Sequence, residues 1–127
     1  MQEKYLFEYA VIRVVPKVER EEFINVGVIL FCKQPAFLGV RYHLDPPRML
    51  ALCATVDTAE ARSQLMAFQE ICAGKTEGGP IALLDPASRF RWLTATRSTV
   101  VQTSKVHPGL SSNAAETLEK LYAALVC

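Results

Sequence analysis

Residues 25–32, NVGVILFC, form an almost unbroken apolar run that follows the charged segment EREEF at 19–23. Such a run, bounded by polar residues, predicts a buried β-strand. Residues 5–15, YLFEYAVIRVV, are rich in β-branched and aromatic side chains and predict a strand that is central or buried on both faces. Residues 37–43, FLGVRYH, predict a third strand, and the short turn KQPA makes it an antiparallel neighbour of the second.

The pattern changes to a helical period after the third strand. Asp45 before Pro46 is typical of a helix N-cap followed by proline in the first turn, and it predicts a short helix. A longer helix is predicted from Asp57, with Glu60 three residues on as in a capping box, to Gly74. One apolar face of this helix is formed by Ala61, Leu65, Phe68 and Cys72.

The last third of the chain returns to strand-like sequence. RFRWLTA at 89–95 and STVVQTSKV at 98–106 predict two strands that form a hairpin, and HPGLSSN at 107–113 predicts a loop. Ser112 or Asn113 then caps a final helix. We therefore expect one α+β domain over residues 1–127, with elements in the order βββααββα. A mostly antiparallel sheet of about five strands carries helices packed on a face.

Composition limits the classes of function. The chain has 127 residues, 50% of them hydrophobic and 21% charged, as expected of a compact fold. Its net charge of +1 gives no support to a dedicated nucleic-acid binder. The first residues lack the basic region, apolar region and cleavage site of a signal peptide, so we expect none. No apolar run is long enough to span a membrane. We expect a cytoplasmic protein with reduced thiols, in which Cys32, Cys53 and Cys72 are core residues and Cys127 is exposed.

The charged segment before the second strand contains the first candidate site. Glu21 and Glu22 suggest a carboxylate pair for acid–base or metal chemistry. Consecutive strand residues point to opposite faces, so we favour a solvated turn instead. Glu22 and Asn25 are kept as candidate ligand- or partner-binding residues. Gly27, inside a strand, predicts a β-bulge or a close approach by a neighbouring group.

The second candidate site lies in the basic segment from residue 89 to residue 109. Its candidate binding residues are Arg89, Arg91, Arg97 and Ser98. Guanidinium and hydroxyl groups suit phosphate or carboxylate recognition, and Trp92 beside them suits stacking on a nucleobase. The alternative places the strand arginines on the solvent side of an edge strand and Trp92 in the core. Arg97 and Ser98, at the predicted hairpin tip, are the stronger candidates.

Familiar catalytic and metal-binding motifs are missing from the sequence. There is no Walker A loop, GxGxxG, HExxH, GxSxG, EF-hand loop or zinc-finger spacing. His43 and His107 have no carboxylate or nucleophile nearby in the sequence to form a catalytic pair. We therefore predict no catalytic residue, no metal site and no cofactor.

Three stretches together resemble the bacterial domain-of-unknown-function 3037 family: YAVIRVVPKVEREEFINVGVILFC at 9–32, RFRWLTATRSTVVQTSKVHPGL at 89–110 and LEKLYAALV at 118–126. The resemblance covers nearly the whole chain. Members often carry Arg-Gly-Glu where this chain has Arg20, Glu21 and Glu22. The resemblance implies no known activity and no catalytic residues. It also implies neighbours that are HipA-like kinases, and hence a partner or accessory role.

Three hypotheses about function follow. The first is a non-enzymatic accessory module that acts with a protein partner such as a HipA-like kinase. The alternative is a binder of nucleic acid or of a phosphate-bearing ligand through the arginine and serine residues of the basic segment. The weakest is a metal-dependent hydrolase that uses Glu21 or Glu22. The sequence leaves the oligomeric state open.

Overall fold

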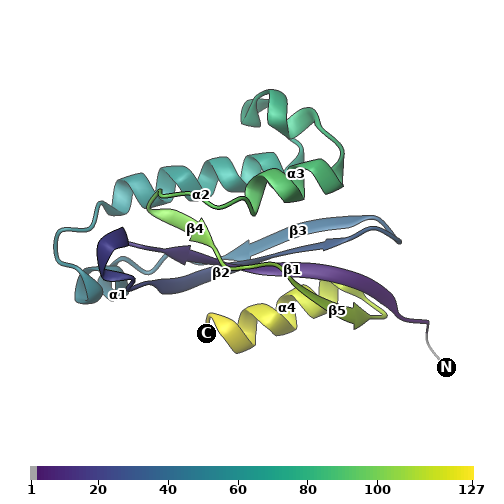
Figure 1. Cartoon of the computed structure of the whole chain (residues 1–127), viewed down its shortest axis with the longest axis horizontal. Coiled ribbons are helices and arrows are strands. Elements are labelled where there is room, and N and C mark those ends of the chain that lie inside the picture. Colours follow the sequence, from purple (N-terminus) through teal and green to yellow (C-terminus); the bar gives the residue numbers. More distant parts are fainter. Residues whose placement is uncertain (1–2) are drawn as a thin grey trace.

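The computed structural model describes residues 3–127, without the side chain of Val18, and has one five-stranded antiparallel sheet with helices on both faces (Figure 1). The strands are β1 (Tyr5–Val14), β2 (Ile24–Cys32), β3 (Phe37–Tyr42), β4 (Val101–Thr103) and β5 (His107–Ser111). Their order is β3-β2-β1-β4, and β5 pairs with β1 beside β4. The predicted α+β class is confirmed. Met1 and Gln2 of the predicted domain lie outside the described residues.

Helices cover the sheet from two sides. They are α1 (Pro46–Leu52), α2 (Thr58–Ala73), α3 (Pro86–Leu93) and α4 (Ala114–Leu125), and the 3-10 turns are η1 (Val18–Arg20), η2 (Thr76–Gly78) and η3 (Pro80–Leu83). In Figure 1, α2 and α3 lie above the sheet and α4 lies below it. The sequence predicted helices on one face, and the structure adds α4 on the other. None of the helices in residues 3–127 is long and apolar enough to cross a membrane.

The strands β1 and β2 are buried on both faces, as their apolar runs predict. Ala10, Ile12 and Ile29 belong to the core beneath α2 and α3. Phe7 and Leu30 belong to the second core, beneath α4. Successive strand residues point to opposite faces, so a continuous apolar run supplies both cores at once.

Three predicted helix starts are confirmed by capping hydrogen bonds. The side chains of Asp45, Asp57 and Asn113 accept from the backbone N–H groups of residues 48, 60 and 116. Gly74 ends α2 with a φ of 73°, a left-handed conformation that costs glycine little. The predicted apolar face of α2 is buried along its whole length.

The predicted strand at 89–95 is wrong, because most of this segment is helical. Helix α3 begins at Pro86, and Asp85 caps it by accepting from the N–H of Ser88 at 3.1 Å. The sequence Asp-Pro-Ala-Ser is the same type of start signal as that of α1. The alternation of arginines with Phe90 and Trp92 in RFRWL imitated a strand, but the helix period accounts for buried Phe90 and Leu93 equally well.

The fifth strand lies within the segment predicted as a loop. β5 contains Pro108 and Gly109 and pairs only with β1, which is the edge position where proline is tolerated. β4 and β5 do not form a hairpin, because both pair with β1 along its length. Between them, Ser104 continues the pairing: its Oγ accepts from the Val11 N–H at 2.8 Å.

Gly27 lies next to a β-bulge, as predicted. Ile12 pairs with Gly27 and Arg13 pairs with Asn25, which leaves Val26 as the extra residue. A Cβ at position 27 would lie 2.6 Å from Tyr42 Cβ and 2.7 Å from the Arg41 carbonyl oxygen. The close approach is therefore made by the neighbouring strand β3.

Candidate functional site

A groove runs between α2, α3 and β4, and most of its lining is apolar. Its volume is about 310 Å³, and its lining residues are Gln64, Ala67, Phe68, Ile71, Trp92, Leu93, Arg97, Thr99 and Val101. Phe68, Ile71 and Leu93 are buried and belong to the core, so the floor of the groove is the outer side of a well-packed region. Helices α2 and α3, strand β4 and the loop between α3 and β4 line this groove, which we call the Trp92 groove.

Trp92 forms one wall of the groove and is 41% exposed. The alternative interpretation, which places Trp92 in the core, is therefore wrong. It occupies α3 two positions after buried Phe90, and a helix places such a residue on a different face. The exposed indole therefore leaves apolar surface open to water at the edge of an apolar hollow.

Arg97 lies over the ring of Trp92, with its Cζ atom 4.2 Å from the ring centroid. Its Nη1 donates to the Leu93 carbonyl oxygen at 3.1 Å, and its Nη2 donates to that of Trp92. The guanidinium therefore caps the C-terminal end of α3, where a positive charge is favourable. Partial burial lowers the pKa of Arg97, but arginine keeps its charge at neutral pH.

The other residues of the basic segment do not join Arg97. The Arg91 guanidinium forms two hydrogen bonds with the Glu8 carboxylate, at 2.8 and 3.0 Å, on a different face of α3. Arg89 packs against Gly74 at the end of α2, and its buried Nε has no hydrogen-bond partner within residues 3–127 as described. Ser98 is exposed in the loop after α3. These residues are therefore spread over the surface, and the phosphate-binding alternative has less support than it would have if they formed one cluster.

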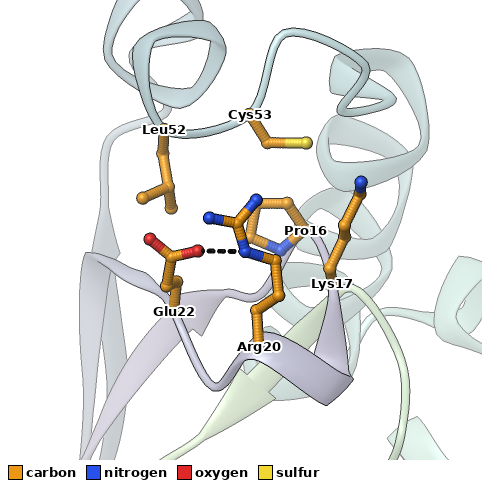
Figure 2. Close-up of a pocket in the computed structure, with 6 residues that line it drawn as sticks. All are labelled: Pro16, Lys17, Arg20, Glu22, Leu52 and Cys53. Atoms are coloured by element: carbon orange, nitrogen blue, oxygen red, sulfur yellow. Dashed lines mark ion pairs between the residues drawn. The ribbon is translucent and has the colours of Figure 1, made fainter.

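Glu22 lies at a small pocket together with two cations and a thiol (Figure 2). Its carboxylate pairs with Arg20 Nε at 2.6 Å, and Figure 2 shows Cys53 and Lys17 at the same pocket. The cavity volume is only about 10 Å³, too small for an organic ligand. Among the described residues, no three His, Cys, Asp or Glu side chains come together as a metal-binding group.

Cys53 is not a core residue, contrary to the prediction. It is half-buried, and its Sγ lies 3.4 Å from the Thr55 hydroxyl. Hydrogen bonding to Thr55, assisted by the charges of Lys17 and Arg20, lowers the pKa of this thiol. The helix α1 ends one residue before it, which brings the side chain to the surface.

Asn25 lies apart from Glu22, at a pocket of about 200 Å³ between β2, α1 and the end of α4. Its Nδ2 donates to the Leu125 carbonyl oxygen at 3.2 Å, which fixes the orientation of the amide. Its Oδ1 is buried and has no hydrogen-bond partner in the part of the chain that the structure describes. Glu22, Asn25 and Arg97 therefore line three separate hollows, and the two candidate segments do not share one site.

Comparison with protein families identifies the chain. A family model described as a protein of unknown function, DUF3037, matches residues 9–126. The chain belongs to the DUF3037 family. No curated protein and no solved structure matched it. The family description gives no activity, so the function of this DUF3037 protein has to be argued from its own surface.

The sequence missed most of the Trp92 groove. Gln64, Ala67 and Ile71 recur on α2 with helical spacing, but the same spacing also describes an ordinary buried face. The one available signal was the pair Trp92 and Arg97, five residues apart. With α3 assigned as a helix, that spacing would have placed the arginine just beyond the helix end, within reach of the indole.

Proposed function

We propose that this DUF3037 protein is a non-enzymatic accessory module that docks a partner protein in the Trp92 groove. The observation that carries the proposal is the exposed indole of Trp92 along an apolar groove of about 310 Å³. Tryptophan and arginine are the side chains most enriched among the residues that dominate binding energy at protein interfaces. In this groove one of each lies in direct contact.

The chemistry of the rim suggests what the partner presents. Among the described residues, Arg97 is the only charged one that lines the groove, and none of those residues that line it is acidic. An apolar side chain would fill the hollow between Phe68 and Trp92, and a neighbouring carboxylate would pair with Arg97. We therefore propose a segment of another protein that carries a large apolar residue next to an acidic one.

The family resemblance implies a HipA-like kinase as the partner, and this makes such a kinase the first protein to test. The location we propose is the cytoplasm. The four cysteines, which are all free, support it, because disulfides rarely persist in that compartment.

Site-specific photo-crosslinking tests the docking site. A photoreactive residue replaces Ala67, which is exposed and lines the groove, and in a matched control it replaces Ala124, which is exposed on α4. We expect Ala67 to crosslink to one protein, at a segment with an apolar and an acidic residue, and Trp92→Ser to abolish the product. The Ala124 control should not give it.

Other outcomes would contradict the proposal. The same products from Ala67 and Ala124 would show contact without a preferred site. Crosslinks only between copies of this chain would make the groove a self-association surface. A HipA-like kinase that crosslinks at Ala124 alone would show that the kinase docks elsewhere.

A further inference from the structure

A second hollow lies on a different face of α3 from the Trp92 groove. It is formed where the first half of β1 and the end of β2 meet α3, and its volume is about 530 Å³. This volume falls within the range of small-molecule sites in proteins. Ala87 and Arg91, one helical turn apart, form the side that α3 contributes.

The floor of this hollow is apolar and open. Leu6 is 63% exposed, although it lies within β1, and buried Phe31 and partly buried Ala87 line the hollow beside it. The residue opposite Leu6 on β5 is Leu110, which is 65% exposed. A ligand with an apolar body would remove part of this surface from water, which is favourable in proportion to the area covered.

The charges around the hollow are positive. Of the residues that the structure describes, Lys4, Lys33 and Arg91 line it together with one acidic residue, Glu8. Glu8 is already paired with Arg91 through two hydrogen bonds, at 2.8 and 3.0 Å. Neither lysine makes an ion pair or hydrogen bond with any residue of the described chain, 3–127. Two positive charges therefore remain without a counter-charge beside the apolar floor.

We propose that this hollow binds a small organic anion with an apolar body. Its carboxylate or phosphate group would lie between Lys4 and Lys33, and its body would contact Leu6 and Phe31. Ammonium groups that hydrogen-bond an anion give stronger interactions than neutral donors. The Gln34 amide, which also lines the hollow, supplies a further polar group for orientation. This inference is independent of the docking of a partner protein in the Trp92 groove.

The proposal is tested by titrating the whole protein with four probes and monitoring its NMR chemical shifts. The probes are phenyl phosphate, benzoate, benzyl alcohol and inorganic phosphate. We expect phenyl phosphate or benzoate to shift the NMR signals of residues 4–8, 31–34 and 87–91. The probe that binds more tightly identifies the anionic group that the hollow prefers. Benzyl alcohol, which lacks the charge, and inorganic phosphate, which lacks the body, should both bind more weakly.

Variants separate the proposed contacts from general charge. The double variant K4Q/K33Q should weaken binding of the better probe roughly tenfold or more and reduce its salt dependence. The matched variant K75Q/K105Q removes two exposed lysines elsewhere and should leave the affinity unchanged. Leu6→Ser should weaken the binding of phenyl phosphate but not that of inorganic phosphate.

Three results would overturn the proposal. The first is that neither aromatic anion binds at millimolar concentration. The second is that K75Q/K105Q loses as much affinity as K4Q/K33Q. The third is that the NMR signals that shift all belong to residues outside the hollow. Because Trp92 and Arg97 lie outside the hollow, failure here leaves the docking proposal intact. Failure of the Ala67 crosslink likewise leaves this one intact.

Discussion

At the scale of single residues, the charged turn before β2 is defined by its backbone rather than by its carboxylates. Glu21 has a φ of 57°, and it is the only described residue other than glycine with a positive φ. Side chains with a Cβ disfavour this left-handed conformation by roughly 1–2 kcal/mol. Glycine would adopt this conformation at little cost, whereas Glu21 adopts it with a side chain present.

Glu21→Gly should stabilise the protein. Relief of the left-handed conformation exceeds the entropy that glycine adds to the unfolded chain, and we expect a gain of roughly 0.5–1 kcal/mol in the free energy of unfolding. Urea denaturation measures it. Glu19→Gly, in η1 of the same turn, is the control and should be destabilising. A loss of stability in both variants would show that residue 21 is not strained.

Gly27→Ala should be destabilising, because the new methyl group would meet Tyr42 and the Arg41 carbonyl. Overpacking of this kind costs about 1–3 kcal/mol. Urea denaturation measures this loss. The urea concentration at the midpoint of unfolding should fall, and the dependence of the unfolding free energy on urea concentration should not change. A variant within about 0.5 kcal/mol of the natural protein would mean that β2 and β3 separate more easily than the structure indicates.

The cysteines should differ in reactivity. The pKa of Cys53 is lowered, chiefly by hydrogen bonding to Thr55, so its reactive thiolate forms at lower pH than an ordinary thiol. Burial raises the pKa of Cys72 to about 12. Mass spectrometry after brief alkylation from pH 6 to pH 9 should find Cys53 modified first and Cys72 last. Thr55→Val should move the Cys53 profile to higher pH; an unchanged profile would contradict this assignment.

At the scale of elements, α3 is the helix on which both proposed sites depend. It supplies Trp92 to the groove and Arg91 to the hollow. With only eight residues, it is too short to be stable by itself, so its ends matter. Asp85 caps the N-terminus and Arg97 hydrogen-bonds the carbonyls at the C-terminus.

The Asp85 cap should make the stability of α3 depend on pH. Hydrogen bonds from Ser88 lower the pKa of Asp85 from 3.8, so its stabilising effect is present above about pH 4 and is lost as the pH falls through the lowered pKa. Asp85→Ala should therefore reduce stability at pH 7, and should reduce it less near pH 2, where the protonated carboxyl offers only a neutral acceptor oxygen. Asp85→Asn, which retains an acceptor oxygen, should lose less at pH 7. Urea denaturation at both pH values measures this, and an equal loss at both would contradict the role of the carboxylate.

At the scale of the whole molecule, local signals predicted the fold well and the surface poorly. The caps Asp45, Asp57 and Asn113 are specified by neighbours in the sequence, so the helices that they start were predictable. The pairing of both β4 and β5 with β1 depends on contacts across about a hundred residues, which no local pattern contains. The exposure of Trp92 likewise follows from how α2 and α3 pack together.

The central proposal is tested most directly with the partner captured at Ala67. The measurement is the affinity of this partner for the Trp92→Ser variant and for the Leu83→Ser variant. Leu83 is 68% exposed and lies outside the Trp92 groove, so it controls for the loss of an exposed apolar side chain. If the groove is the docking site, Trp92→Ser weakens binding by roughly 30-fold, as truncation of a central tryptophan does, and Leu83→Ser leaves it unchanged. Equal affinities of the two variants would contradict docking in the Trp92 groove.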